Sequence, residues 1–331
     1  MNDELTHNPK NAVTESIVRE AFQGRPAVKK VLTKVNRPDT PAEWRASEEL
    51  DHWNYWRREA EVYLSELPKL IGDTALRLPE LLHFAETDEQ ITLWLEDVHG
   101  RTGAQLSIDD YERICHAWGS AQNKILPLLE HEWCSAQFIR RYGESKPVDY
   151  GLLEDDGAWQ QPLIANNWDE QVLRPGLIKL HKQRQQLLEI LAQTETLPCH
   201  LDFWPNNLVV TDDSVVLLDW SFFGTGAPAE DVGNFIPDAV FDGFVASQQL
   251  PELEEKLVAA YLKGRNETMD PSTLYATAVK YVWLGPLLLA RASEVEQTIY
   301  GGALVTDANA QYFHRGKALQ YLCQWVDRVL G

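Results

Sequence analysis

Several residue types and patterns are scarce in this chain, and each shortage narrows the class of protein. The four cysteines, Cys115, Cys134, Cys199 and Cys323, form no C-x-x-C pair, so we expect reduced structural thiols rather than a disulfide framework. The longest apolar-rich run, YVWLGPLLLA, is too short to cross a bilayer and contains a proline. No signal-peptide segment is found at the N-terminus. These features predict a soluble, cytoplasmic protein with no membrane partner.

Basic residues are also few. The chain has 30 Lys and Arg against 50 Asp and Glu, a formal net charge of -20. A surface of that sign repels phosphates, which argues against nucleic acid or an anionic membrane as a partner. The acidic excess fits solubility alone, and it also fits a cationic small-molecule ligand.

The 331 residues, 44% of them hydrophobic, are enough for two lobes. Apolar spacing and turn residues divide the chain into a disordered tail over 1–12, a first lobe over 13–98 and a second lobe over 99–331. In the first lobe we expect a helix over 14–22, a lysine-bearing strand over 27–35, a long helix over 51–67, and strands within 76–86 and 90–98. In the second lobe we expect a helix over 108–126, a lid-like connection over 142–168, a helix over 177–193, a hairpin over 207–220 and helices after 251.

One short stretch, CHLDFWPNNLVV, carries polar residues at the spacing H-x-D-x-x-x-x-N directly before the hairpin. Asn207 begins the first strand and Asp219 ends the second, so a tight turn brings them side by side. Asp202 lies on the loop that leads in. Three oxygen-bearing side chains are therefore expected at one end of the hairpin.

Asparagine and aspartate oxygens suit Mg²⁺ better than zinc, and the adjacent Cys199 and His200 lack a chelating spacing. Phosphoryl transfer uses such a set, in which the metal bridges nucleotide phosphates and a further carboxylate orients the attacking hydroxyl. The pattern therefore predicts a metal–phosphate site, against the alternative of ordinary turn residues.

The segment CHLDFWPNNLVV…VVLLDWSFFGTGAPAEDVGNF resembles the catalytic segment of the aminoglycoside phosphotransferase and choline kinase-like superfamily. LWLEDVHG and HWNYWRREAEVY are also similar to bacterial members. The resemblance implies an α+β, protein-kinase-like bilobal fold. It has a small mixed α/β first lobe, truncated here, and a larger, mainly helical second lobe with a catalytic β-hairpin. It also implies transfer of the γ-phosphate of ATP or GTP, with Mg²⁺, to a small-molecule hydroxyl.

Carried over to this sequence, the resemblance makes Asp202 the catalytic base and Asn207 and Asp219 the metal ligands. His200 would brace the catalytic loop through hydrogen bonds. Asp231, in AEDVGN, would support the same loop, with a simple helix N-cap as an equal alternative.

In the first lobe the resemblance implies a strand lysine on the nucleotide phosphates, paired with a helix glutamate. Lys34 and Glu59 are the candidates, although Lys29 and Lys30 compete for the lysine role and two solvated surface charges are the alternative. The backbone of Glu96 to Val98 would bond the adenine edge, with the side chains of Glu96 and Asp97 simply polar.

The chain departs from the family pattern upstream of Lys34. The fold needs two strands joined by a phosphate-covering loop before the lysine strand, but little chain precedes Lys34 and its sole glycine is Gly24. We therefore expect a truncated loop, or first strands replaced by the helix over 14–22, and weakened nucleotide binding.

The acceptor is not identified by the sequence. An aminoglycoside, an amino sugar or a choline-like alcohol would suit acidic and aromatic side chains, and a neutral sugar or macrolide hydroxyl is an alternative. Candidate lining residues are Trp204, Asp238, Asp242, Tyr281 and Trp283, the last two with a core role as the alternative. The chain is expected to be an active small-molecule kinase, as a monomer or homodimer. A pseudokinase or ligand-binding protein, or a hydrolase using the same metal site, are the alternatives.

Overall fold

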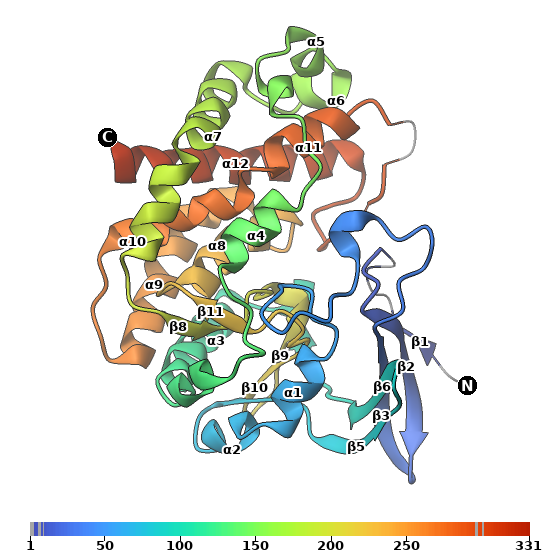
Figure 1. Ribbon diagram of the computed structural model, residues 1–331. Coiled ribbons are helices and arrows are strands. Elements are labelled where there is room, and N and C mark those ends of the chain that lie inside the picture. Colours follow the sequence, from blue (N-terminus) through green and yellow to red (C-terminus); the bar gives the residue numbers. More distant parts are fainter. Residues whose placement is uncertain (1–2, 6–7, 9, 295–296, 300) are drawn as a thin grey trace.

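The computed structural model describes residues 3–5, 8, 10–294, 297–299 and 301–331, and it shows two lobes, one built on a sheet and one mainly helical (Figure 1). Five strands form the sheet of the first lobe in the order β1-β2-β3-β6-β5. All its pairings are antiparallel. Their bounds are β1 (Asp3–Glu4), β2 (Thr14–Phe22), β3 (Arg25–Thr33), β5 (Leu81–Glu86) and β6 (Gln90–Glu96). The α+β expectation is confirmed.

The expected helix over 14–22 is wrong, because this segment is strand β2. Its nine residues pair with β3 across a two-residue turn. Both turn residues have a positive φ, 51° at Gln23 and 81° at Gly24, as a tight hairpin between twisted strands requires. The hairpin was unexpected because TESIVREAF carries helix-start residues at its beginning, whereas its pairing with β3 decides the conformation.

The beginning of the chain differs from the expected tail where it is described. Asp3 pairs with Arg19 of β2, and Glu4 pairs with Val18. Positions 1, 2, 6, 7 and 9 of the expected tail lie outside the described residues. The sheet thus has a first strand of two residues, so the first strand is shortened rather than replaced by a helix.

Helix α1 (Arg58–Leu64) is much shorter than the helix expected over 51–67. The buried Arg58 guanidinium donates to the backbone carbonyls of Leu50, His52 and Trp53. Those carbonyls are therefore held in turns that precede the helix. Trp53, Trp56, Ala60 and Tyr63 are nevertheless all buried, as their spacing indicated.

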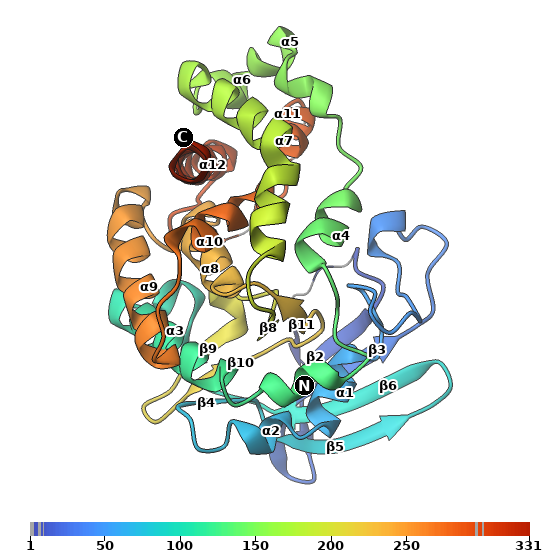
Figure 2. The same ribbon diagram turned by 60° about the vertical axis from the view of Figure 1, so that its left-hand side comes forward.

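The second lobe is mainly helical, and a small four-stranded sheet lies beside its helices (Figure 2). This sheet has the order β4-β10-β9-β7, so the expected hairpin is present as β9 and β10. A further two-stranded sheet joins β8 and β11. The strand bounds are β4 (Leu76–Arg77), β7 (Arg101–Thr102), β8 (Leu197–Cys199), β9 (Leu208–Val210), β10 (Val215–Leu217) and β11 (Gly224–Gly226).

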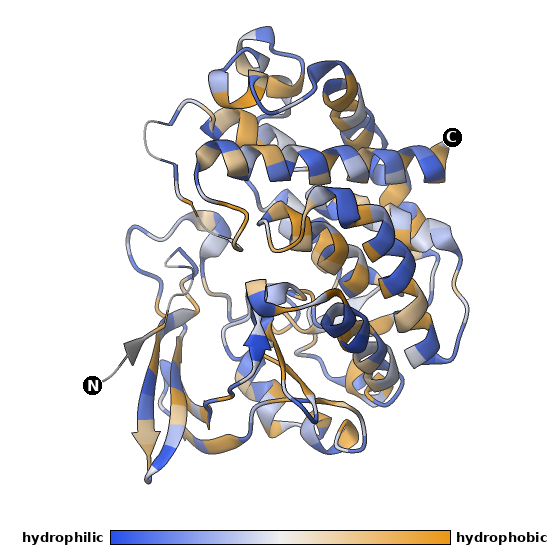
Figure 3. Cartoon of the chain, turned by 180° about the vertical axis from the view of Figure 1, so that it is seen from behind, coloured by the Kyte–Doolittle hydropathy of each residue, from blue (hydrophilic) through white to orange (hydrophobic). Residues whose placement is uncertain are grey.

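The helices of the second lobe carry both hydrophobic and hydrophilic positions, as helices with one buried face do (Figure 3). The expected connection over 142–168 contains the short helices α5 and α6 and the end of α4. The expected helices over 108–126 and 177–193 are present as α3 and α7. The remaining bounds are α2 (Leu67–Leu70), α3 (Ile108–Gln122), α4 (Phe138–Glu144), α5 (Asp156–Trp159), α6 (Pro162–Ala165), α7 (Glu170–Ala192), α8 (Glu230–Phe241), α9 (Leu250–Arg265), α10 (Pro271–Ala276), α11 (Leu284–Arg291) and α12 (Ala308–Leu330).

The stretch Pro271–Arg291 is long and apolar enough to span a membrane by composition alone. In the structure it is divided into α10, a 3-10 turn over Thr277–Tyr281 and α11. Of its most apolar window, 72% is buried inside the protein. Its apolar character is accounted for by the core of the helical lobe.

Candidate active site

The loop over residues 200–207, called the catalytic loop after its expected role, is held by hydrogen bonds to its backbone. Leu201 has a φ of 70°, a left-handed conformation that is costly for a side chain of this kind. The two carboxylate oxygens of Asp231 accept hydrogen bonds from the amides of His200 and Leu201, at 3.0 and 2.8 Å. Asp231 thus braces the loop from the first turn of α8, and it does not act as an N-cap, since Ala229 occupies that position.

His200 is a second brace. Its Nδ1 accepts from the amide of Asp202 at 3.3 Å, and its Nε2 lies 2.9 Å from the carbonyl oxygen of Leu218 and donates to it. Complete burial lowers the pKa of this imidazole to about 4, so it is neutral at physiological pH. A neutral ring with one donor and one acceptor fits both contacts.

Asp202 and Asn207 are in direct contact, as the spacing indicated. The Asn207 Nδ2 donates to the Asp202 carboxylate at 2.8 Å and to its carbonyl at 3.0 Å. These bonds leave the amide oxygen of Asn207 as the atom able to bind a cation. Burial and the negative charge of Asp219 raise the pKa of Asp202 to about 6, within the range useful for a base near neutral pH.

Asp219 follows β10 with a φ of 54°, and its backbone places it beside Asn207, whose carbonyl accepts from the amide of Leu218 at 2.8 Å. The Lys30 ammonium and the hydroxyl of Ser221 both donate to Asp219 Oδ1, at 3.0 and 2.8 Å. Although burial opposes ionisation, these donors lower the pKa of Asp219, so it remains a carboxylate.

The lysine that pairs with Glu59 is Lys30 and not the expected Lys34. The Nζ of Lys30 lies 2.6 Å from Glu59 and 3.0 Å from Asp219, and all three side chains meet between the lobes. Lys34 lies just past the end of β3, where its Nζ contacts Glu48 at 3.2 Å near the surface. Period-two alternation puts residues 30, 32 and 34 on the same face, but only the first two lie within the strand. The competing alternative, Lys30, is therefore the one that Glu59 contacts.

Burial acts on both members of this ion pair, with opposite outcomes. It raises the pKa of Glu59 to about 7 despite the adjacent ammonium. The two carboxylates outweigh the effect of burial on Lys30 and raise its pKa above the usual value. Lys30 therefore stays charged and links β3, α1 and the end of β10.

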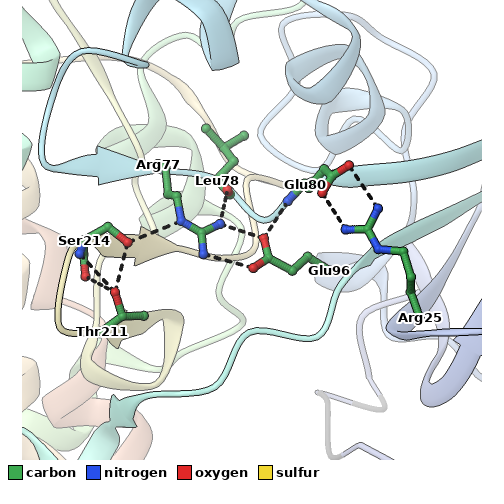
Figure 4. A network of polar contacts seen from close by, with 7 residues as sticks. All are labelled: Arg25, Arg77, Leu78, Glu80, Glu96, Thr211 and Ser214. Carbon is green, nitrogen blue, oxygen red and sulfur yellow. Dashed lines mark hydrogen bonds and ion pairs between the residues drawn. The ribbon is translucent and has the colours of Figure 1, made fainter.

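Glu96 is the last residue of β6, and Val98 lies in the connection that follows it toward the second lobe. The carboxylate of Glu96 makes a two-pronged ion pair with Arg77, with contacts of 2.6 and 3.0 Å, and accepts from the amide of Glu80 (Figure 4). Arg77 also donates to Ser214 in the turn of the β9–β10 hairpin. The Glu96 side chain thus holds the end of β6 on the hairpin, while Val98 is the second residue after the strand.

Of the expected acceptor residues, Asp238, Asp242 and Tyr281 lie close enough to influence one another, whereas the direct contacts of Trp204 and Trp283 are with other residues. The hydroxyl of Tyr281 donates to Asp238 at 2.7 Å, whereas Asp242 pairs with Arg315 at 3.2 Å. The ring of Trp204 lies 6.1 Å from that of Phe244, and Trp283 lies in a separate group of aromatic rings around Lys146. Burial raises the pKa of Asp238 to about 7.

Lys280, a buried lysine that contacts the catalytic loop, was not predicted from the sequence. Its Nζ donates to the carbonyl of Leu201 at 3.3 Å, and its charge lowers the pKa of Asp202, Asp231 and Asp238 against the effect of burial. The available signal was a lysine within the apolar run TAVKYVWLGPLLLA. A lysine at such a position needs a partner in the core.

These observations agree with comparisons to known proteins. The model of the phosphotransferase enzyme family (APH) matches residues 67–271. A search of the curated proteins finds no significant match. Among solved structures, the chain is similar to a spectinomycin phosphotransferase in complex with ADP and spectinomycin, with 12% identity and a TM-score of 0.56 over 98% of this chain and 93% of that one.

Two more solved structures share this fold. One is an amicoumacin kinase in complex with AMP-PNP, Ca²⁺ and Ami, with 11% identity and a TM-score of 0.53 over 97% of this chain and 88% of that one. The other is the aminoglycoside phosphotransferase APH(4)-Ia, with 14% identity and a TM-score of 0.52 over 100% of this chain and 94% of that one. The chain has the protein-kinase-like fold of these enzymes and belongs to the phosphotransferase enzyme family.

Proposed function

We propose that this phosphotransferase is a small-molecule kinase that transfers the γ-phosphate of ATP or GTP to a hydroxyl of a small acceptor. The observation that carries the proposal is the meeting of Lys30, Glu59 and Asp219 beside the Asp202–Asn207 pair. A cation for phosphate, a carboxylate–amide set for a metal and a carboxylate of raised pKa are the parts that phosphoryl transfer needs.

Each of these residues has a proposed role. Lys30, held by Glu59, binds phosphate oxygens as a point charge. Asp202 accepts the proton of the attacking hydroxyl on its carboxylate, while Asn207 fixes that carboxylate by hydrogen bonding. The backbone around Val98 takes the adenine or guanine edge. His200 and Asp231 position the loop without touching the reacting atoms.

The residues present fit Mg²⁺. Asp219 is kept ionised by its donors, and the amide oxygen of Asn207 is turned away from Asp202. Hard cations prefer such oxygen ligands, and the phosphates and waters complete their shell. When bound, Mg²⁺ neutralises the charge of the transferred phosphate. The AMP-PNP, Ca²⁺ and ADP named for the similar solved structures support a nucleotide donor and a divalent metal.

A pseudokinase or ligand-binding protein is the second candidate. The observation that favours it is the two-residue strand β1, followed by a connection to β2 without any glycine. Backbone amides of a glycine-rich loop cover the phosphates in protein kinases. For either candidate we propose a cytoplasmic monomer or homodimer that acts on a free small molecule, with no nucleic acid or membrane partner.

The test is thermal unfolding with ATP or GTP, with and without Mg²⁺, for the wild type and Asp219→Ala. At about 100 times its dissociation constant the nucleotide should stabilise the wild type by roughly 2.7 kcal/mol with Mg²⁺, and this shift should disappear in Asp219→Ala. Asp213→Ala, an exposed carboxylate in the turn of the same hairpin, is the matched control and should keep the shift.

Turnover completes the test. Phosphorylation of hydroxylated amines or sugars should be lost in Asp202→Asn, which keeps the shape of the side chain but cannot accept a proton. Nucleotide binding without turnover in the wild type would favour the pseudokinase. Release of phosphate at a rate that added alcohols leave unchanged would favour a hydrolase.

A further inference from the structure

Lys146 lies inside a cage of four aromatic rings. Its Nζ is 3.7 Å from the ring centroid of Tyr142, 4.0 Å from that of Trp44, 5.4 Å from that of Trp53 and 5.6 Å from that of Trp283. The rings meet edge to face, with interplanar angles of 82°, 86° and 74° along the series Trp44, Trp53, Tyr142 and Trp283. Ring faces turned toward one point form a site for a cation.

Both lobes contribute to this cage. Trp44 and Trp53 lie on the connection between β3 and α1, whereas Tyr142 lies on α4 and Trp283 directly precedes α11. Trp53 is fixed by Arg58, which donates to its carbonyl at 3.0 Å. The cage therefore forms only when that connection is packed on the helical lobe.

The resident lysine suits the cage poorly. Its Nζ is buried and has no hydrogen-bond partner among the described residues. A primary ammonium has three N–H donors, and leaving them unsatisfied in a buried site is costly. Burial lowers the pKa of Lys146 to about 7, although Glu43 opposes this shift. A large part of the Lys146 population is thus uncharged at neutral pH.

The cage adjoins the catalytic loop. Trp53 packs edge to face on Phe222 at 5.6 Å, and Tyr142 stacks on Phe138 at 5.1 Å. Phe222 and Phe138 belong to one buried cluster with Leu201, the residue before Asp202. The cage therefore packs on the same apolar cluster that contains part of the catalytic loop.

We propose that this cage is the acceptor subsite for a quaternary ammonium group, and that Lys146 is a placeholder which the acceptor displaces. A quaternary ammonium has no N–H donors to satisfy, so it suits a site made mainly of ring faces, whereas a primary ammonium loses hydrogen bonds to water there. The inference rests on the proposed function, since it names the acceptor class of that same site.

Displacement has a pH consequence. Lys146 expelled to water regains an ordinary pKa near 10.4, so above pH 7 ligand binding takes up a proton. The affinity for a permanently charged ligand must then fall by up to about tenfold per pH unit between pH 7 and 9, and stay constant below pH 7.

Among the described residues, the other charged groups near the cage are Glu43 beside Lys146, His52 stacked on Trp53, Arg141 of α4 paired with Asp51, and Lys280 near Phe138. Burial lowers the pKa of His52 from its usual value, which keeps its titration below this window. Any other group that titrates in this range is also present in the Lys146→Ala variant. The difference in pH dependence between the wild type and this variant therefore reports on Lys146 alone.

The experiment titrates tetramethylammonium chloride into the full chain and follows tryptophan fluorescence at pH 6 to 9, with NaCl as the ionic-strength control. We expect Lys146→Ala to bind more tightly than the wild type and without the pH dependence above 7. Lys29→Ala removes another lysine over an indole, that of Trp94 at 5.6 Å, and should behave as the wild type. Trp44→Leu, at a half-buried ring, should weaken binding roughly tenfold.

Each outcome decides the inference. Absence of saturable binding to Lys146→Ala that still unfolds cooperatively, or full affinity in Trp44→Leu, would overturn the cage as a site. A wild-type affinity that is constant between pH 7 and 9 would overturn the displacement of Lys146. Because the titration contains no nucleotide, a failure of the cage is separate from a failure of the nucleotide-dependent shift that tests the kinase.

Discussion

Two buried lysines serve the carboxylates of this site in different ways. Lys30, from the sheet lobe, makes direct ion pairs with Glu59 and Asp219 at 2.6 and 3.0 Å. Lys280, from the helical lobe, makes no direct ion pair among the residues that the structure describes, and it donates to the carbonyl of Leu201 instead. Its charge acts at longer range on several carboxylates.

This difference between direct ion pairing and a more distant charge explains why the pKa values of Asp219 and Asp202 differ. The two donors on Asp219 keep its pKa low, whereas Asp202, which has an amide donor and the more distant charges of Lys280 and Lys30, has a pKa of about 6. A metal ligand must stay ionised, and a base must exchange a proton near neutral pH. Direct pairing suits the first role and a more distant charge suits the second.

The largest effect is expected from breaking the direct pairs. Lys30→Met should lower kcat/KM by roughly 100- to 1,000-fold, because it removes a charge aimed at the phosphates and leaves Glu59 buried without a partner. Lys34→Met, four residues away at the surface, should stay close to the wild type. Equal losses in both variants, measured by steady-state kinetics, would contradict the assignment of Lys30.

A smaller effect is expected from removing the distant charge. Lys280→Met should raise the pKa of Asp202 above about 6, because the cation that favours its ionised form is gone. The kcat/KM should then fall by up to about tenfold at pH 6 and far less at pH 8. The pH profile separates this effect from structural damage, which would lower the activity equally at all pH values. Lys317→Met on α12 is the control.

The smallest effect concerns Glu230, a buried carboxylate in the field of Lys280. Burial raises its pKa to about 8, so the folded state binds a proton that the unfolded state has released above about pH 4.5. The free energy of unfolding therefore falls as pH rises from 4.5 to 8. Glu230→Gln is neutral in both states and should be more stable than the wild type at pH 8, by on the order of 1 kcal/mol, and equal at pH 4.

Urea unfolding at both pH values measures this difference. The exposed Glu255→Gln on α9 is the control and should show no pH-dependent gain. A stability of Glu230→Gln that falls below the wild type at pH 8 would mean that the ionised carboxylate is favourable there, against the expected cost of burial.

The sequence predicted the helical lobe better than the sheet lobe, because the key residues of the helical lobe lie close together in the chain. Asn207 and Asp219 lie at the ends of a hairpin, so twelve residues of chain place them together. The partner of Glu59 depends on which residue of β3 faces α1, and that depends on where the strand ends. The helix expected over 14–22 was wrong because pairing with β3 outweighed local helix preferences.

By itself the sequence determined the spacing of Asp202, Asn207 and Asp219, the excess of negative charge and the resemblance to a kinase family, because these are properties of adjacent residues and of composition. Only the tertiary structure decided that Lys30 pairs with Glu59, that Lys280 lies behind the catalytic loop and that four distant aromatic rings surround Lys146. The charge state and the partner of a side chain depend on its burial and on contacts with residues far away in the chain, and the local sequence determines neither.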